Sequence, residues 1–291
     1  MNLQRIFILF TVLLIILGFI IYIAFPERSL TISTTTSLYA TGLLDYIQER
    51  YGELDPGLTI KIIPQGSGAA LETAARGDAD IVFAHAPNLE KEYIDRGVLK
   101  DGVIIAYNYF IVVGPRDDPA GISDSKDIEE VFQKIYQAGE EGKATFVSRG
   151  DRSGTHVREL MLWEAAGLEP GGDWYIESGS GMGETLLLAN QLGAYTLSDI
   201  GTYTIFSKKG KINELTKLFE KDDKLLNIYS IYLVSGRETE DAKRFYQYVV
   251  DNISRLIREF NEREGATIFY PVDTFEGDLK LLWQRFSTGK L

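Results

Sequence analysis

The chain contains no cysteine among its 291 residues. That absence excludes disulfides, cysteine-ligated zinc, thiol nucleophiles and a lipidated-cysteine anchor. Only two histidines, His85 and His156, remain as nitrogen ligands. Positive charge is also scarce, since 30 Lys and Arg stand against 42 Asp and Glu, a formal charge of −12. Because a nucleic-acid surface needs a clustered basic face, no nucleic-acid partner is expected.

One long apolar run stands near the N-terminus. Residues 7–25 carry no charge, Arg5 precedes them, and Glu27 and Arg28 follow. A bilayer crossing needs about 20 apolar residues, whereas the apolar part of a signal peptide has about 7–15. The sequence therefore favours an uncleaved membrane anchor in residues 1–28 over a cleaved signal, with Arg5 in the cytoplasm. The remainder is expected at the extracytoplasmic face, or secreted or periplasmic if the segment is cleaved.

A strand, a turn rich in Ser, Thr and Gly, and a helix follow one another four times. The turns are residues 34–37, 64–68, 148–155 and 178–183. Strands that alternate with helices in this way predict an α/β fold with largely parallel sheets.

Each of these turns leads into a helix N-terminus. Ser and Thr cap helices and Gly permits tight turns, so capping alone explains any single one of them. A helix N-terminus also presents unpaired N–H groups and the positive end of the helix dipole. Two such helix starts from each of two lobes would suit one bound anion.

Motifs for other chemistries are missing. The sequence has no G-x-x-x-x-G-K-[ST], and residues 179–183 depart from G-x-G-x-x-G, which argues against nucleotide binding. No G-x-S-x-G surrounds a candidate serine, so a nucleophile elbow is unsupported. A serine hydrolase that uses Ser153 or Ser37 with His156 remains as an alternative of another class.

Six short motifs in order carry a family resemblance: STTTS (33–37), QGSG (65–68), VFAHAP (82–87), SRGDRSGTH (148–156), GMGETL (181–186) and AYTLSD (194–199). Together they resemble the tungstate-binding proteins of ABC importers, in the type II periplasmic-binding-protein superfamily, over about residues 30–272. The resemblance implies two α/β lobes joined by two crossover strands and closed around a tetrahedral oxyanion. It also implies a monomer without enzyme activity, cofactor or bare metal ion, which delivers its ligand to an ABC permease and its ATPase.

The resemblance implies an oxyanion site drawn from both lobes: Thr36, Ser37, Ser67 and His85 from lobe one, and Arg149, Ser153, Gly154, Thr155, Met182, Gly183 and Tyr195 from lobe two. Among them, Arg149 is expected to pair with the anion, because its charged fork gives two hydrogen bonds to one oxyanion. The alternatives are a surface arginine paired with Asp151, and for Tyr195 a core aromatic.

His85 stands where phosphate-binding relatives carry an aspartate that accepts a hydrogen bond from protonated phosphate. An imidazole N–H donates instead, which suits a fully deprotonated dianion that offers acceptors only. This difference favours tungstate or molybdate, with sulfate left open, over phosphate. The alternative is a histidine packed at a strand end without a ligand role.

Two apolar segments suit the passages between lobes, residues 107–114 and 227–234. Lobe one is then expected in residues 29–110 and 230–291, and lobe two in residues 111–229. A helix over residues 238–262 has apolar residues at helical spacing and is expected to pack on lobe one.

Overall fold

The computed structural model describes residues 7, 10–13, 16, 28–220 and 222–291. The anchor or signal expected in residues 1–28 lies almost entirely outside them. Within the described part, no helix combines the length and the apolar character that a bilayer crossing requires.

The strands form one extended sheet and a small second one, and their bounds are β1 (Arg28–Thr35), β2 (Leu58–Gln65), β3 (Ile81–Ala84), β4 (Leu99–Pro115), β5 (Phe146–Ser148), β6 (Tyr175–Glu177), β7 (Thr196–Asp199), β8 (Leu215–Phe219), β9 (Leu226–Val234) and β10 (Tyr270–Pro271). The α-helices are α2 (Thr36–Thr41), α3 (Leu43–Gly52), α4 (Ser67–Ala75), α5 (Pro87–Asp95), α6 (Ile128–Glu140), α7 (Gly154–Ala165), α8 (Met182–Leu192), α9 (Ile200–Lys208), α10 (Glu240–Glu264) and α11 (Leu279–Ser287). Three short 3₁₀ helices are η1 (Ile122–Asp124), η2 (Asp223–Leu225) and η3 (Val272–Thr274).

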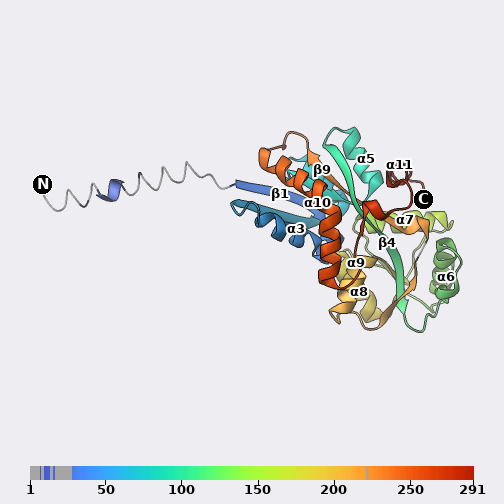
Figure 1. Ribbon diagram of the computed structural model, residues 1–291. Helices are drawn as coiled ribbons and strands as arrows, with labels where there is room; N and C mark the ends of the chain where they lie inside the picture. The colour runs from blue at the N-terminus through green and yellow to red at the C-terminus, as the bar shows by residue number, and fades with distance from the viewer. Residues whose placement is uncertain (1–6, 8–9, 14–15, 17–27, 221) are drawn as a thin grey trace.

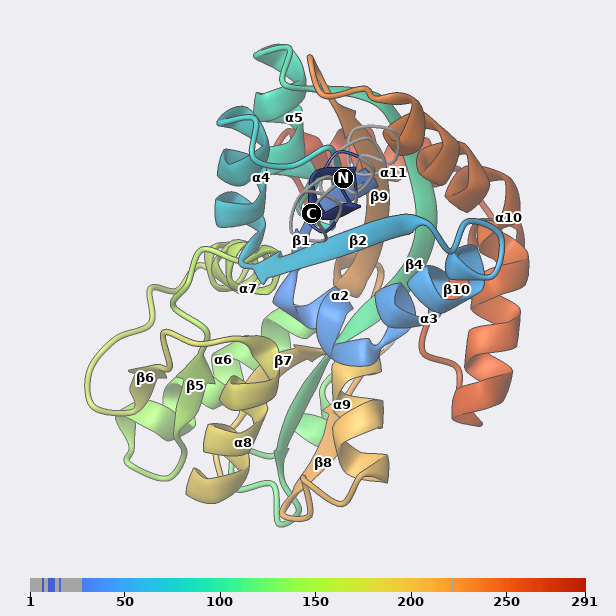
Figure 2. The same ribbon diagram turned by 90° about the vertical axis from the view of Figure 1, so that its left-hand side faces the viewer.

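Two lobes share the chain, and the long strand β4 runs through both (Figure 1). Up to Tyr109, β4 pairs with β9, and from Phe110 it pairs with β7 and β8. Figure 2 shows β1, β2 and β9 in one lobe, and β5 to β8 in the other. The expected two-lobed α/β architecture is therefore confirmed.

The point at which β4 changes partners also suggests where the lobes divide. All of β9 pairs with β3 and β4 of lobe one, beginning with Leu226 opposite Tyr109. We therefore propose residues 28–109 and 226–291 as lobe one and residues 110–225 as lobe two. The chain thus returns to lobe one at residue 226, a few residues before the expected 230, because the whole of β9 joins the sheet of lobe one.

The extended sheet is mixed, which corrects the expectation of largely parallel sheets, whereas the small sheet of β5 and β6 is parallel. β1 pairs in parallel with β2 and β3, and β5 with β6. β9 is antiparallel to both β3 and β4, and β7 and β8 are antiparallel to β4. The physical reason is that the chain leaves lobe one along β4 and returns along β9, so these two neighbours run in opposite directions.

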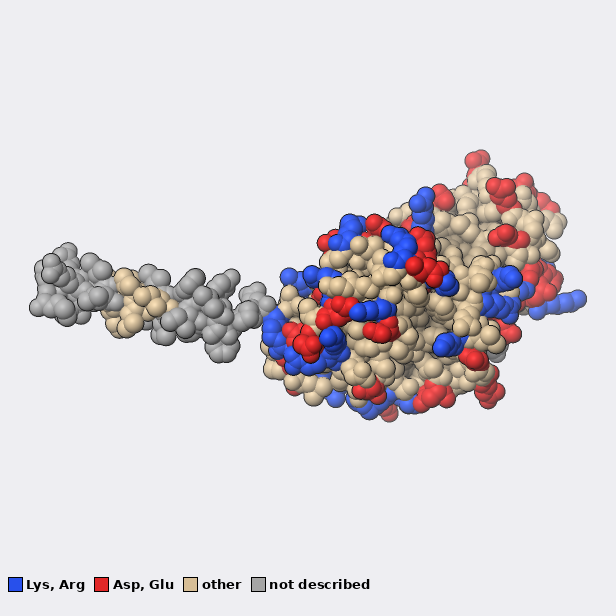
Figure 3. Space-filling model, turned by 90° about the horizontal axis from the view of Figure 1, so that it is seen from above, with Lys and Arg blue, Asp and Glu red and all other residues tan. Residues whose placement is uncertain are grey.

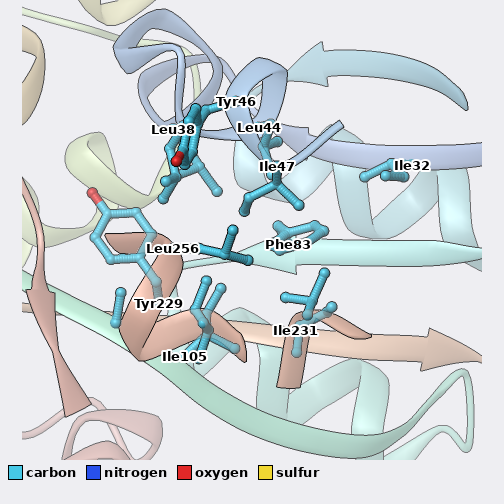
Figure 4. Packing of buried hydrophobic residues seen from close by; sticks show 14 of the residues in the cluster. Ile32, Leu38, Leu44, Tyr46, Ile47, Phe83, Ile105, Tyr229, Ile231 and Leu256 are labelled. Atoms are coloured by element: carbon cyan, nitrogen blue, oxygen red, sulfur yellow. The ribbon is translucent and has the colours of Figure 1, made fainter. Parts of the chain in front are cut away.

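Apolar side chains of the sheet and of α3 and α10 form the core of lobe one. Ile32, Phe83 and Ile231 come from three neighbouring strands and face the helices, where they pack with Leu256 and other residues of α10 (Figure 4). Fully burying such a side chain contributes about 1.5–3 kcal/mol. The helix expected over residues 238–262 is α10, which begins after Thr239, whose hydroxyl caps the N–H of Ala242.

An aromatic cluster in lobe two holds the turn between β5 and α7. The ring of Trp163, on α7, lies 5.4 Å from that of Phe146 on β5 and 4.4 Å from that of Phe132 on α6. Glu159, also on α7, accepts a hydrogen bond from the hydroxyl of Ser148, the last residue of β5. Both ends of the segment 149–153 are therefore fixed by buried contacts.

The helical segment that follows the turn of residues 34–37 is divided in two. The apolar spacing after Ser37 continues through residue 51, but α2 ends at Thr41 and α3 begins at Leu43. Between them Gly42 has φ 85°, the left-handed region that favours glycine. The break lets α2 pack against α8 and α9 of lobe two.

Candidate functional site

The helix starts predicted from the four turns meet where the lobes join. The N–H of Gly154, which begins α7, donates to Oγ of Ser67, which begins α4, over 2.9 Å. A Cβ atom added to Gly181, the residue before α8, would lie 3.5 Å from Cβ of Thr36, the first residue of α2. Each lobe thus contributes two of the four turns to one place.

Three hydrogen bonds join the lobes directly at this place. The first is the bond between Gly154 and Ser67. In the second, Nη2 of Arg149 donates to Oγ1 of Thr36 over 3.0 Å. The third is a weak one, since the Thr202 hydroxyl lies 3.4 Å from the carbonyl oxygen of Ser37 but donates mainly to Oδ2 of Asp199 over 2.7 Å. The lobes are therefore closed on each other around these residues.

Arg149 follows β5 and is 1% exposed. Its Nη2 atom donates to Asp151 over 2.5 Å as well as to Thr36. Its Nε and Nη1 atoms are buried and have no hydrogen-bond partner among the described residues. Burial lowers the pKa of Arg149 although the Asp151 carboxylate opposes the shift. The pairing with Asp151 exists, but the arginine is buried at the lobe junction, and two of its nitrogens have no partner in the part of the chain that the structure describes.

The segment after Arg149 supplies another unpaired donor. Thr155 is 1% exposed, and no described residue pairs with its hydroxyl. A buried hydroxyl without a partner is costly, so its donor hydrogen is available to a ligand. Ser153 instead caps α7, since its Oγ accepts from the N–H of His156 over 3.3 Å.

His85 lies just after β3 and is held on both sides. Its Nε2 atom is 2.9 Å from Oγ of Ser37, and its Nδ1 atom is 2.9 Å from Oδ1 of Asn227. The imidazole stacks on the Tyr229 ring at 4.9 Å. Burial lowers the pKa of His85 to about 4, so the ring is neutral at pH 7.

This geometry changes the role expected for His85. Because protein groups occupy both ring nitrogens, the imidazole does not offer a free N–H to an anion. We therefore place His85 behind Ser37, as a residue that orients the serine, rather than as the direct donor expected from the sequence. The alternative of a histidine packed at a strand end describes its position better, although it contacts Ser37.

The remaining predicted residues lie in different surroundings. Met182 begins α8, and its side chain is buried in the apolar core of lobe two, so of this residue only the backbone remains as a polar group at the helix start. Gly183 packs against α9, since an added Cβ would lie 2.5 Å from the Phe206 ring.

Tyr195 is fully buried in the lobe-two core and its hydroxyl donates to Asp118 over 2.7 Å. The structure thus places Tyr195 as the core aromatic of the alternative, apart from the other predicted residues.

The histidine and serines of the hydrolase alternative are not arranged as a base and a nucleophile. Nδ1 of His156 accepts the backbone N–H of Arg152 over 3.0 Å. Oγ of Ser153 accepts a hydrogen bond from the backbone N–H of His156, not from its imidazole ring. Ser37 contacts His85 instead, and a histidine whose pKa is about 4 is a weak base at neutral pH.

Two site residues were missed by the sequence reasoning, Asn108 and Asn227. Both are buried, and they face each other as neighbours on β4 and β9. The available signal was a single asparagine within each of the two apolar crossover segments, since a buried amide needs partners.

Comparison with known proteins agrees with this geometry. A PBP superfamily domain matches residues 26–252. A putative ABC transporter anion-binding protein of Haloferax volcanii is 51% identical over 176 residues, which cover 60% of this chain and 50% of that protein, so the match spans half of its length. The tungstate-binding protein TupA of Peptoclostridium acidaminophilum is 36% identical over 254 residues, which cover 84% of this chain and 86% of that protein.

A solved structure supports the same relationship. The crystal structure of the tungstate ABC transporter from Geobacter sulfurreducens aligns with a TM-score of 0.70 and 37% identity, covering 80% of this chain and 99% of that one. The chain therefore belongs to the PBP superfamily and, within it, to the family of the TupA tungstate-binding proteins.

Proposed function

We propose that this protein captures tungstate outside the cell membrane and delivers it to the permease of an ABC importer, without a chemical step. The observation that carries the proposal is the Arg149 guanidinium, which is buried where helix starts from both lobes meet and has two donor nitrogens that no described residue pairs with. The relatives that bear the name tungstate-binding protein support the choice of ligand.

The unpaired groups next to α7 are donors. Nε and Nη1 of Arg149 only donate hydrogen bonds, and the hydroxyl of Thr155 has a hydrogen to give. A fully deprotonated dianion such as tungstate or molybdate offers acceptors only, so it matches this set. Molybdate is the first alternative ligand, followed by sulfate and phosphate.

The acidity of the protein does not oppose this function. On the face shown in Figure 3, Lys and Arg side chains are interspersed with Asp and Glu. Charges on the surface are screened beyond about 10 Å at 0.1 M salt. Arg149 and the helix starts act on the anion at contact distance and away from water. Their attraction to the anion therefore outweighs its repulsion by the acidic surface.

The partners and the location follow from the same proposal. The ABC permease and its ATPase would receive the closed, loaded protein, which acts as a monomer. The apolar run of residues 7–25 would anchor the chain in the membrane and leave both lobes on the outer side.

A calorimetric titration of the full-length protein with tungstate, molybdate, sulfate and phosphate tests the proposal. We expect tungstate and molybdate to bind in the nanomolar to micromolar range, and sulfate and phosphate to bind at least about a hundredfold more weakly, a difference of about 3 kcal/mol. Tighter binding of phosphate would contradict the assignment. An ester-hydrolysis assay on the same sample tests the hydrolase alternative, and we expect no turnover above the rate of the His156→Gln variant, which removes the base shared by Ser153 and Ser37.

Thr155→Val tests the second donor. The change removes the unpaired hydroxyl and nearly keeps the shape of the side chain. We expect tungstate affinity to fall about tenfold, since one hydrogen bond to a charged group is worth about 1.5 kcal/mol, while the thermal midpoint of the ligand-free protein stays equal or rises. Thr155→Ser, which keeps the hydroxyl, is the matched control. Equal affinity in the valine and serine variants would show that this hydroxyl does not contact the ion.

A further inference from the structure

A chain of buried hydrogen bonds leads from a backbone carbonyl to Ser37. Nδ2 of Asn108 lies 3.3 Å from the carbonyl oxygen of Ile268, and Nδ2 of Asn227 lies 3.0 Å from Oδ1 of Asn108. Oδ1 of Asn227 lies 2.9 Å from Nδ1 of His85, and Nε2 of His85 lies 2.9 Å from Oγ of Ser37. All four side chains are at most 3% exposed.

The carbonyl of Ile268 fixes the direction of every bond in this chain. A backbone carbonyl only accepts, so Asn108 turns its NH₂ group toward it and its Oδ1 toward Asn227. Asn227 must then donate from Nδ2, which leaves its Oδ1 to accept the proton on Nδ1 of His85. Since a neutral imidazole carries one proton, Nε2 of His85 is an acceptor and receives the hydroxyl hydrogen of Ser37.

The opposite direction is excluded by the same reasoning. A proton on Nε2 of His85 would require Asn227 to turn its NH₂ group toward Nδ1. The two Oδ1 atoms of Asn227 and Asn108 would then face each other, or Asn108 would have to turn its own oxygen toward the carbonyl of Ile268. Either arrangement places two acceptors together in a buried site, at a cost of about 1–3 kcal/mol for each unmet group.

The two asparagines also stand at the hinge between the lobes. Asn108 and Asn227 are opposite each other on β4 and β9, one residue before β4 passes from β9 to β7. The same Nδ2 of Asn227 also donates to the Tyr229 hydroxyl over 2.8 Å, and the Tyr229 ring stacks on His85. The crossover strands thus hold the imidazole from its edge and from its face.

We propose that Asn227, itself oriented by Asn108, is a positioning residue that locks His85 in the Nδ1–H tautomer and thereby holds the hydrogen of the Ser37 hydroxyl on Nε2, so that this hydroxyl does not donate to the ion. The significance for the ion rests on the proposed function, whereas the tautomer is a property of the protein alone. The Ser37 hydroxyl is therefore not one of the donors to the ion, a role that is left to the guanidinium of Arg149 and the hydroxyl of Thr155.

Nitrogen-15 NMR of the imidazoles tests this proposal directly, because the full-length protein has only two histidines. At pH 7 we expect the proton of His85 on Nδ1. His156 provides an internal reference for the other tautomer. Its Nδ1 accepts a hydrogen bond from the backbone N–H of Arg152, so its proton lies on Nε2. His156→Gln assigns the two signals. A proton on Nε2 of His85 in the unmodified protein would overturn the proposal without any ligand present.

Two substitutions test the role of Asn227. Asn227→Leu removes the acceptor, and we expect His85 to lose its single Nδ1–H form, while tungstate affinity should not fall, because the Ser37 hydroxyl is not a donor to the ion. Asn227→Asp keeps an acceptor for Nδ1–H, so the proton on Nδ1 should remain. Asn252→Asp repeats the charge change at a half-buried position of α10, outside the chain of hydrogen bonds, and should alter neither the tautomer nor the affinity.

The outcomes separate this proposal from the proposed function. An unchanged Nδ1–H signal in a folded Asn227→Leu protein would overturn the role of Asn227, even if tungstate binds well. Failure of the unmodified protein to bind tungstate would remove the proposed function and leave the tautomer result standing. If Asn227→Leu does not fold, the tautomer of His85 in the unmodified protein still decides the direction of the chain.

Discussion

Replacing Arg149 by alanine is expected to weaken tungstate binding about a thousandfold, which corresponds to about 4 kcal/mol. The guanidinium has two buried donors without a partner among the described residues, and each hydrogen bond between charged groups is worth about 1.5–3 kcal/mol. The thermal midpoint of the ligand-free protein should change by only a few degrees. The alanine variant loses one ion pair with Asp151, but it also loses a buried charge whose desolvation that pair offsets only in part.

Arg149→Lys separates the charge from the shape of the guanidinium. Lysine keeps the positive charge but not the planar fork that donates two parallel hydrogen bonds, so we expect a loss of about tenfold to a hundredfold. Calorimetric titration and thermal unfolding of the three proteins measure both effects. A collapse of the ligand-free fold in Arg149→Ala would give this residue a structural role, and full affinity in that variant would place the ion elsewhere.

The second large effect is expected from Gly154→Val, which should hold the lobes apart. An added Cβ on Gly154 would lie 3.0 Å from the carbonyl oxygen of His85 and 3.1 Å from Oγ of Ser67, both in the opposite lobe. The further methyl groups of valine would need still more space, and overpacking of this kind costs about 1–3 kcal/mol. We expect tungstate affinity to fall up to about a hundredfold, with an intermediate loss in Gly154→Ala. In solution scattering, the radius of gyration of the valine variant should not decrease when tungstate is added.

Gly171→Val is the matched control for this experiment. Gly171 lies in an exposed loop of lobe two, and an added Cβ there meets no heavy atom within 4 Å. Its affinity and its scattering should match those of the unmodified protein. A Gly154→Val protein that still contracts and binds tightly would show that the lobes do not approach as closely in solution as Gly154 and Ser67 do in this structure.

The positions of the helix starts could be predicted because their signals are local. Ser67 and Gly154 each follow an apolar strand within a few residues, and the residue types that favour the start of a helix are adjacent in the sequence. The convergence of these starts was predicted from the family resemblance, and the bond between Gly154 and Ser67 agrees with it. Arg149 was identified in the same way, but its burial depends on packing across the lobes.

The partners of individual side chains could not be predicted, because they come from distant parts of the chain. His85 meets Asn227, 142 residues away, and that contact decides which nitrogen holds the proton. Tyr195 stands one residue before β7, and only the packing of lobe two shows that its hydroxyl turns to Asp118. The mixed sheet has the same origin, since strand direction depends on how β4 and β9 cross between the lobes.

The direct bonds between the lobes also bear on how quickly the protein takes up its ion. Each of them joins two protein groups, as Gly154 and Ser67 do, so they favour the shut molecule whatever it contains. Only the open fraction admits an ion, and the observed association rate is therefore the intrinsic rate multiplied by that fraction. An ion already inside must wait for the same bonds to break, so escape is slowed as well. The same contacts between the lobes therefore slow both the entry and the release of the ion.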